Sequence, residues 1–298
     1  MLKNLHQLDQ VNFKYLVLGS NGLLGNELKK ILPSSQTILA ARNKSQYNFN
    51  FENFVKLEDI FKKFKFKYVI NCAAITNLAY CERNFKKAKK VNTDLPKKLI
   101  DLSNKYKFKL IQISTDQLFF NKSNKLNKEN KRLVAINKYS KTKILAEQYI
   151  KKSKDYLIVR TNFTGFKKEL KSTFVGWLYS SIEKKVKIKL FNDMYVSTLD
   201  VKNFALILKR LININASGVF NLATRRPISK KDFAVYFTKK LKKQMFFDEI
   251  SVTSTLNKIK RARYLGLDVN KIQKKLKIKM ISPYEAIDNL IKQIPKKY

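Results

Sequence analysis

Apolar and polar positions follow two patterns along the first half of the chain. Short continuous apolar runs predict buried β-strands, and the longer segments between them, in which apolar residues recur every three or four positions, predict amphipathic helices. Regular alternation of the two is typical of βαβ units in a parallel sheet. The expected strands are 15–18, 37–41, 68–74, 109–115 and 156–161, and the expected helices are 23–32, 55–64, 93–106 and 139–151.

The alternation weakens beyond Gly165. Two helical segments, 173–184 and 201–211, flank a loop centred on 192–198, a further strand is expected at 218–224, and the remainder is helical. We therefore expect an α/β protein, with a doubly wound parallel-sheet Rossmann domain and a smaller C-terminal α/β domain for the substrate. The expected boundaries are 1–164 for the Rossmann domain, with 196–224 returning to it, and 165–195 and 225–298 for the substrate domain.

The composition is that of a folded globule, with 298 residues of which 44% are hydrophobic. No run approaches 18 consecutive apolar residues, and the first residues lack the apolar core of a signal peptide. The two cysteines, Cys72 and Cys81, are too few for a disulfide framework, and the single histidine excludes most zinc sites. These features predict a cytoplasmic protein without a membrane span or a metal.

The charge is strongly positive, because 63 Lys and Arg residues face 22 Asp and Glu residues, which gives a net charge of +41. Such a charge is typical of proteins that bind nucleic acid, where basic side chains displace counterions from phosphates. Here the lysines are spread over the expected helix faces, and no nucleic-acid motif accompanies them. We therefore do not expect a nucleic-acid partner, but the charge would attract anionic ligands such as nucleotide phosphates.

Three of the seven glycines stand in one turn, Gly19-x-x-Gly22-x-x-Gly25, between the first expected strand and the first expected helix. Gly19 permits the tight turn, Gly22 lets a pyrophosphate approach the backbone, and Gly25 lets the helix pack closely on the strand. The helix N-terminus offers free N–H groups to phosphates. The turn predicts a dinucleotide site, and a strand-to-helix turn without a ligand is the alternative. The neighbouring residues expected to contact the dinucleotide are Asn21, Leu23 and Leu24.

The end of the second expected strand bears on the choice between NAD and NADP. A carboxylate that binds the ribose hydroxyl of NAD is expected about 20 residues beyond the glycine turn. The sequence there is ILAARNKSQ, which holds Arg42 and Lys44 and no acid. An arginine at this place favours the 2′-phosphate of NADP. We therefore expect NADPH as the cofactor, with NADH as the alternative, although Arg42 could also be an ordinary surface arginine.

A second motif could supply the chemistry of ketone reduction, in which the oxygen must receive a proton. Tyr139 can donate it if a nearby cation lowers its pKa from the usual value of about 10. Lys143 stands four residues later on the same helix face, where it could also bind the nicotinamide ribose. Thr115 or Ser114, at the end of the preceding strand, could hydrogen-bond the carbonyl. A chance Tyr-x-x-x-Lys pair and a helix or turn cap are the alternative interpretations.

The glycine turn and this Ser/Thr…Tyr-x-x-x-Lys arrangement resemble the short-chain dehydrogenase/reductase superfamily. Longer segments resemble one family within it, the dTDP-4-dehydrorhamnose reductases, which reduce a 4-keto group on nucleotide-linked 6-deoxysugars. The likeness is collinear over nearly the whole chain. The segments are VINCAAITNLAYCE, ISTDQLF, YSKTKILAE, VRTNFTG, NDMYVSTLDVKNFALIL and RARYLGLDVNKI. They are similar, in that order, to the family's VINAAAYTxVDxAE, ISTDYVF, YGKTKLAGE, LRTSWVYG, DQxGSPTxxxDLAxxI and RPxNSxLDxSKL.

The resemblance implies an NADPH-dependent reductase of a nucleotide-linked 4-keto-6-deoxysugar, for the synthesis of surface polysaccharide or lipopolysaccharide. It implies that Thr115, Tyr139 and Lys143 are catalytic, and it allows a homodimer. For Arg160 a structural role is at least as well supported as a functional one. The implied cofactor contacts are Ala73, Ala74 and Thr76, in addition to the glycine turn, Tyr139 and Lys143. The implied substrate contacts are Thr76, Asp116, Gln117, Asn192, Ser197 and Thr198.

The chain also departs from the family pattern. Gln117 replaces a tyrosine that faces the substrate in the family, and Ala79 replaces an aspartate. Ser140 replaces a glycine, Ala135 a proline, and V-S-T the usual G-S-P-T. These departures leave the sugar open. Two alternatives of the same fold therefore stand beside the reductase: an epimerase or dehydratase, for which Asp116 is the candidate acid–base group, and a non-catalytic nucleotide-binding regulatory subunit.

Overall fold

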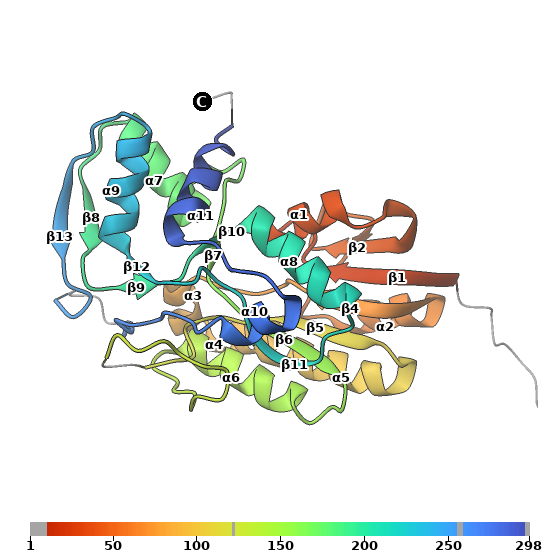
Figure 1. Ribbon diagram of the computed structural model, residues 1–298. Helices are drawn as coiled ribbons and strands as arrows, with labels where there is room; N and C mark the ends of the chain where they lie inside the picture. Colours follow the sequence, from red (N-terminus) through yellow and green to blue (C-terminus); the bar gives the residue numbers. More distant parts are fainter. Residues whose placement is uncertain (1–10, 121–122, 255–258, 296–298) are drawn as a thin grey trace, which may run out of the picture.

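The apolar runs of the first half pair side by side into one seven-stranded sheet, in which every pair is parallel (Figure 1). The structure is a computed structural model and describes residues 11–120, 123–254 and 259–295. The strand order is β11-β6-β5-β4-β1-β2-β3. The strands are β1 (Val11–Leu18), β2 (Thr37–Ala41), β3 (Tyr47–Asn48), β4 (Phe64–Asn71), β5 (Lys109–Ile113), β6 (Tyr156–Arg160) and β11 (Gly218–Asn221). The expected doubly wound α/β fold is confirmed.

Helices cover both faces of this sheet because each buries one apolar stripe against it. On one face lie α1 (Leu23–Ile31), α8 (Val201–Asn213) and α10 (Asn270–Leu276). On the other face lie α2 (Phe54–Lys63) and α5 (Leu95–Tyr106), with α6 (Lys138–Ile150) packed beside α5. The order of the sheet reverses between β1 and β4, and ligands of such folds bind at the carboxyl ends of the strands at this point.

The start of α6 is fixed by a reciprocal cap. Asn137 accepts a hydrogen bond from the backbone N–H of Ser140, and the Ser140 hydroxyl accepts one from the backbone N–H of Asn137. Ser140 is fully buried. The serine that departs from the family pattern therefore contributes to the N-terminus of the helix that carries Tyr139 and Lys143.

Two short helices between β4 and β5 were not expected from the sequence. They are α3 (Leu78–Arg83) and α4 (Phe85–Lys89), and a π-helical turn over Lys90–Asp94 joins them to α5. Helices of five or six residues show too little of the 3.6-residue period to be recognised in the sequence. The helix expected to start at residue 93 begins at Leu95, because the π-helical turn before it interrupts the regular spacing.

The C-terminal part packs around a hydrophobic cluster of its own, separate from the clusters on the two faces of the sheet. It contains α7 (Phe174–Glu183), α9 (Lys230–Lys240) and α11 (Pro283–Ile291), together with β8 (Ile188–Phe191) and β13 (Phe247–Ile250), which pair in parallel. The segment 192–198, expected as a loop, contains the short strand β9 (Tyr195–Val196). That expectation was incomplete, because β9 pairs with the distant β12 (Ile228–Ser229). A second short pair joins β7 (Phe163–Thr164) to β10 (Leu199–Asp200).

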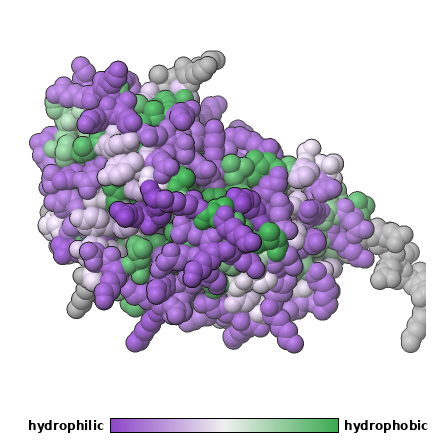
Figure 2. Space-filling model, viewed as in Figure 1, coloured by the Kyte–Doolittle hydropathy of each residue, from purple (hydrophilic) through white to green (hydrophobic). Residues whose placement is uncertain are grey.

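The surface seen in Figure 2 is mostly hydrophilic, with smaller hydrophobic areas between the polar side chains. In the described part of the chain, none of the helices combines the length and the apolar character that crossing a membrane requires. Within the same residues, no group of three or more His, Cys, Asp or Glu side chains is placed to hold a metal ion. The chain's single histidine, His6, lies outside the described residues.

Candidate active site

The glycine turn connects β1 to α1 at the reversal of the sheet order. Gly19 has a φ of +79°, and a Cβ there would lie 2.8 Å from the backbone nitrogen of Ala73. A Cβ on Gly25 would collide with the Gly19 carbonyl oxygen and lie 2.6 Å from Cα of Ser20. Gly22, at the N-cap of α1, has more room, because its Cβ would meet only the Gly19 oxygen, at 3.1 Å. The turn thus requires glycine at both ends for its own geometry.

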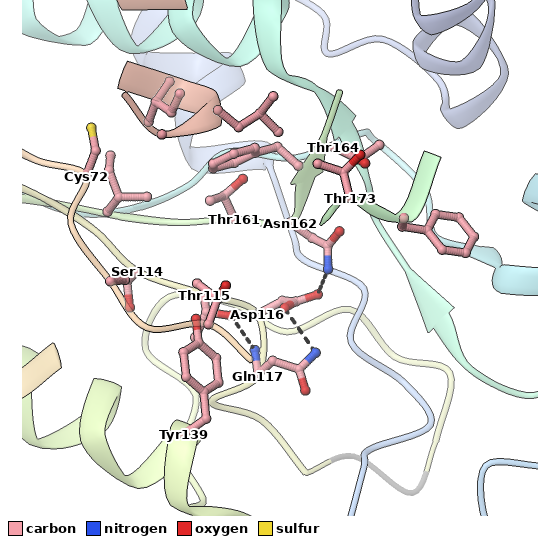
Figure 3. A pocket seen from close by; sticks show the side chains of 18 of the residues that line it. Cys72, Ser114, Thr115, Asp116, Gln117, Tyr139, Thr161, Asn162, Thr164 and Thr173 are labelled. Atoms are coloured by element: carbon pink, nitrogen blue, oxygen red, sulfur yellow. Dashed lines mark hydrogen bonds between the residues drawn. The ribbon is translucent and has the colours of Figure 1, made fainter. Parts of the chain in front are cut away.

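A cavity of about 450 Å³ opens beside this turn, at the carboxyl ends of the central strands (Figure 3). It lies in the size range of small-molecule sites. Many residues expected at the site from the sequence line this one cavity: Gly22, Leu23, Leu24, Gly25, Ala74, Thr76, Thr115, Asp116, Gln117, Tyr139 and Lys143. The parallel sheet brings them together, because the segments that follow β1, β4 and β5 meet at the same edge.

Tyr139 points toward Thr115 within this cavity (Figure 3). Burial raises the pKa of Tyr139 well above its ordinary value, while hydrogen bonding with the Thr115 side chain acts in the opposite direction. The neighbouring Asp116 and Cys81 raise the pKa further. The phenol is therefore protonated at neutral pH, the state in which it can donate a proton.

Lys143 is 2% exposed, and its Nζ donates a 2.8 Å hydrogen bond to the carbonyl oxygen of Ile113. Burial lowers the pKa of Lys143 to about 8, although Glu147 and Cys72 oppose the shift. Lys143 is not among the groups that shift the pKa of Tyr139 here. The ammonium is instead held against the end of β5, on the wall of the cavity.

The structure distinguishes the two hydroxyls that the sequence left open. Ser114 Oγ donates a 2.7 Å hydrogen bond to Oε1 of Glu147, so it is directed toward α6. Thr115 Oγ1 contacts Tyr139 and Asp116 and accepts a 3.2 Å hydrogen bond from the backbone N–H of Gln117. The hydroxyl next to the phenol is therefore that of Thr115.

Asp116 is almost completely buried and lies in the cavity wall. Its Oδ2 accepts a 2.8 Å hydrogen bond from Nδ2 of Asn162, and Thr198 in turn donates a 2.9 Å bond to Oδ1 of Asn162. Burial raises the pKa of Asp116 to about 6, against the effects of Asn162, Lys230 and other polar neighbours. The carboxyl thus titrates just below neutral pH.

The wall of the cavity also carries basic side chains, which the sequence did not reveal. Lys167, Lys230 and Arg261 line it. Lys230 Nζ lies 4.0 Å from the ring centroid of Phe174, and burial lowers the pKa of this lysine to about 8, with Arg261 adding to the shift and Asp116 opposing it. The spacing of the 63 basic residues does not predict which of them line the cavity, because distant segments of the chain bring these three residues to it.

Several expected residues lie off the cavity wall. The Asn192 side chain donates to Glu249 at 3.2 Å, and Ser197 is fully buried, where its Oγ accepts a bond from the backbone N–H of Leu267. Thr198 does not line the cavity; its hydroxyl donates a hydrogen bond to Asn162, which does. These three residues do not line the cavity, and their contact with substrate stays a prediction. Ala73 packs under Gly19, Asn21 donates to the Lys44 carbonyl, and the exposed Arg42 follows β2.

Buried polar atoms without a protein partner gather at this cavity. Among the described residues, the orphaned atoms on its lining are Gln117 Oε1, Thr161 Oγ1 and Arg261 Nε. An unsatisfied buried donor or acceptor costs about 1–3 kcal/mol, and such costs are expected where a ligand completes the hydrogen bonds. The orphaned atoms therefore indicate that the cavity binds a polar ligand.

A doubly wound sheet with a glycine turn and a Thr–Tyr–Lys set at its switch point defines a Rossmann-type α/β protein with a dinucleotide-type cleft. Residues 13–295 match the family described as the RmlD substrate binding domain. The chain belongs to this family, which confirms the resemblance seen in the sequence.

Two curated relatives are similar over most of their length. The chain is 24% identical over 273 residues to the probable low-salt glycan biosynthesis reductase Agl14 of Haloferax volcanii, which covers 87% of this chain and 91% of the relative. It is 27% identical over 222 residues to the spore coat polysaccharide biosynthesis protein SpsK of Bacillus subtilis, which covers 74% of this chain and 77% of that one.

Solved structures share the fold. A dTDP-4-dehydrorhamnose reductase from Clostridium acetobutylicum superposes with a TM-score of 0.84 at 23% identity, covering 94% of this chain and 99% of that one. The dTDP-4-dehydrorhamnose reductase of Bacillus anthracis, solved in complex with NADP, gives 0.83 at 19% identity, covering 95% and 99%. At these identities the likeness is one of fold.

Proposed function

We propose that this protein is an NADPH-dependent reductase of a nucleotide-linked 4-keto-6-deoxysugar, in glycan or surface polysaccharide synthesis. The observation that carries the proposal is the meeting of Thr115, Tyr139 and Lys143 with the glycine turn on one cavity. Membership of the family and the names of the two curated relatives, a glycan biosynthesis reductase and a polysaccharide biosynthesis protein, support the same reaction class.

The residues present fit a nicotinamide dinucleotide. Gly22 has no side chain between the cavity and the N-terminus of α1, where backbone N–H groups can bind a pyrophosphate. Ala74 and Thr76 line the adjoining wall, and the orphaned Thr161 hydroxyl lies on the same cavity. When bound, NADPH supplies the hydride. Arg42 is exposed after β2 and binds the 2′-phosphate in this proposal, with NADH as the alternative.

Three side chains then serve the ketone. Tyr139 donates its phenolic proton to the oxygen as the carbonyl carbon is reduced, which agrees with the protonated state that burial imposes. Thr115 hydrogen-bonds the same oxygen and orients it. Lys143, held on the Ile113 carbonyl, binds the nicotinamide ribose, and its positive charge stabilises the tyrosinate that forms when Tyr139 gives up its proton.

The basic residues of the cavity wall fit the diphosphate of a sugar nucleotide. Lys167, Lys230 and Arg261 place positive charge there, and Arg261 Nε has no protein partner. Arginine and lysine are the usual partners of phosphate oxygens. We assign the substrate-binding part to 165–195 and 225–298, which contain these three residues.

A second candidate of the same fold is an epimerase or dehydratase. It is favoured by Asp116, whose carboxyl faces the cavity and titrates near pH 6, a suitable value for an acid–base group. Such enzymes regenerate their cofactor within the cycle, whereas a reductase consumes NADPH in proportion to product. The stoichiometry of NADPH oxidation therefore separates the two, and NADPH binding without any turnover would indicate the regulatory subunit.

The test is NADPH oxidation with dTDP-4-keto-6-deoxyglucose and related 4-keto sugar nucleotides. We expect turnover by the wild type and a loss of about 10²- to 10⁴-fold in kcat in Tyr139→Phe, with NADPH binding retained. Tyr149→Phe, which alters another tyrosine of α6 that does not line the cavity, is the matched control. Equal rates for Tyr139→Phe and wild type would refute the assigned role of Tyr139.

A further inference from the structure

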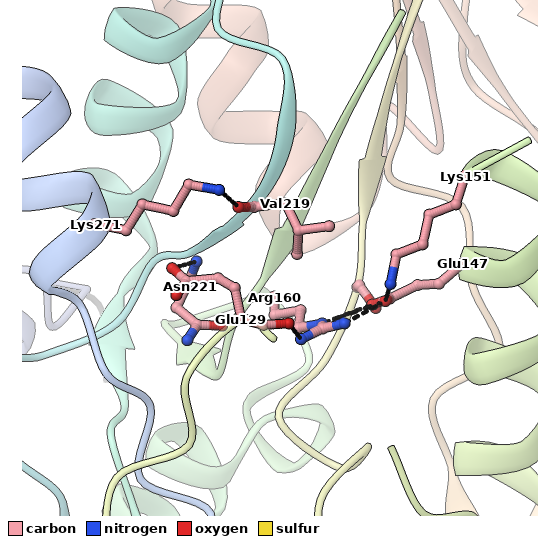
Figure 4. Close-up of polar contacts among 8 residues, drawn as sticks. Glu129, Glu147, Lys151, Arg160, Val219, Asn221 and Lys271 are labelled. Carbon is pink, nitrogen blue, oxygen red and sulfur yellow. Dashed lines mark hydrogen bonds and ion pairs between the residues drawn. The ribbon is translucent and has the colours of Figure 1, made fainter. Parts of the chain in front are cut away.

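Glu147 and Arg160 form a buried ion pair directly behind the candidate site (Figure 4). Arg160 is fully buried and Glu147 is 1% exposed. The Nη2 of Arg160 lies 2.6 Å from Oε2 of Glu147, and its Nε lies 3.0 Å from Oε1. Burial acts to raise the pKa of Glu147, but Arg160, Ser114 and Lys151 hold it below the ordinary value. The carboxylate is therefore charged at neutral pH.

This pair is linked to Lys143 along two routes. Glu147 follows Lys143 by four residues on α6, so the two lie on one face of the helix. Across the gap to the sheet, Lys143 Nζ donates to the Ile113 carbonyl, and the next residue, Ser114, donates to Glu147. The ammonium and the carboxylate thus hold consecutive residues at the end of β5, immediately before Thr115.

The charge of Glu147 opposes the effect of burial on Lys143. Burial disfavours the ammonium, and the groups that counteract it are Glu147 on α6 and Cys72 after β4. The Cys72 thiol is itself neutral, because burial raises its pKa to about 12. Of these two groups, only Glu147 carries a negative charge at neutral pH.

Stability by itself gives little reason for such a pair. Desolvation of two charges offsets most of their attraction, and well-packed apolar residues often replace a buried pair without loss. The network also extends further, since Arg160 Nη1 donates to the Glu129 carbonyl at 2.9 Å. We propose that Glu147 and Arg160 are positioning residues for the active site. They fix α6 against the end of β5, and the Glu147 carboxylate keeps the buried Lys143 ammonium charged.

This inference rests on the proposed function only for the role of Lys143, and its test does not need turnover. The protein is labelled with [13Cε]lysine and titrated by NMR, and the Lys143→Arg variant assigns the resonance. Exposed lysines titrate near pH 10.4, so a lysine that titrates near pH 8 is resolved from them. We expect the Lys143 midpoint to move about one pH unit lower in Glu147→Gln.

Glu147→Gln leaves the buried Arg160 guanidinium unpaired, which disfavours folding. A second variant therefore keeps the test decisive if the first does not fold. Glu147→Gln combined with Arg160→Met removes both charges, and the same lower midpoint is expected. Glu147→Asp keeps the carboxylate and should restore the midpoint toward that of the wild type. Glu58→Gln, which removes a carboxylate of α2 that is paired with Lys98, should leave it unchanged. A wild-type midpoint in the double variant would overturn the proposal.

The two proposals fail in different ways. A wild-type protein that neither binds NADPH nor reduces any sugar nucleotide would refute the proposed function, while the titration of Lys143 would still decide the role of Glu147. If turnover is present, the alkaline limb of its pH profile should move to lower pH in the double variant. A role confined to folding would lower the amount of active protein without moving that limb.

Discussion

The side-chain amide of Asn162 donates a 2.8 Å hydrogen bond to Oδ2 of Asp116, and this bond joins the segment after β6 to the segment after β5. Thr198 supports Asn162 from behind at 2.9 Å. Thr198, which the sequence analysis assigned to the substrate, therefore acts at one remove from the cavity. It holds Asn162, and Asn162 holds Asp116. The ionisation of Asp116 is a measurable consequence of this arrangement.

Asp116→Asn should stabilise the protein at neutral pH. Burial raises the pKa of Asp116 from 3.8 to about 6, so the folded state binds the proton more tightly than the unfolded state. The stability that this proton provides is fully present below pH 3.8 and is lost as the pH rises through about 6. Above that pH, the variant should exceed the wild type by up to about 3 kcal/mol.

Urea unfolding at pH 4, 6 and 8 measures the difference for Asp116→Asn. The gain should become small at pH 4, where the folded-state carboxyl is protonated and the unfolded-state carboxyl is about half protonated. Asp248→Asn, in an exposed ion pair with Lys187, should show no comparable gain. A gain for Asp116→Asn that is equal at all three pH values would contradict the assigned titration.

Lys230→Met should weaken binding of the sugar nucleotide, with a rise in KM of about tenfold and little change in kcat, because one charge–phosphate contact is typically worth about 1.5–3 kcal/mol. The affinity for NADPH should be unchanged, since Lys230, whose Nζ lies over the Phe174 ring, is assigned to the substrate and not to the dinucleotide. Lys231→Met is the matched control, as the neighbouring Lys231 pairs with Glu249. Equal effects of the two substitutions would argue against a substrate contact at Lys230.

Gly25→Ala should lower the stability of the protein, whereas Gly22→Ala should mainly weaken NADPH binding. A Cβ at residue 25 meets the backbone of Gly19 and Ser20 in a rigid turn, so we expect a loss of stability of about 1–3 kcal/mol. At residue 22 the added methyl meets only one atom, at 3.1 Å, but it projects where the pyrophosphate is proposed to bind. Thermal unfolding and NADPH titration together should show a stability loss in the first variant and mainly an affinity loss in the second.

Arg42→Ala should reduce the preference for NADPH over NADH by about tenfold. The guanidinium is exposed at the end of β2, where it can pair with a 2′-phosphate that NADH lacks. The two dissociation constants, measured by fluorescence titration, give the ratio directly, and NADH serves as the internal control. An equal loss of affinity for both cofactors in the variant would show that Arg42 does not bind the 2′-phosphate.

Local pattern was sufficient for most of the sheet and for one half of the site. Apolar runs bounded by turn residues predicted β2 at its observed bounds and the other central strands within a few residues. The glycine spacing predicted a turn whose two ends admit no side chain. The i, i+4 spacing predicted Tyr139 and Lys143 on one face of α6, because a helix of 3.6 residues per turn places them there.

Other features arise only from contacts between distant segments. The sequence determined the alternation of strands and helices, the glycine turn and the Tyr139–Lys143 spacing, because each depends on residues within a strand or one or two helical turns. Only the tertiary structure decided that Thr115 faces Tyr139 while Ser114 is directed to Glu147. It also placed Lys230 and Arg261 on the cavity wall and Ser197 inside the core. These positions depend on pairings such as β9 with β12, whose partners are more than 30 residues apart, and no local spacing encodes them.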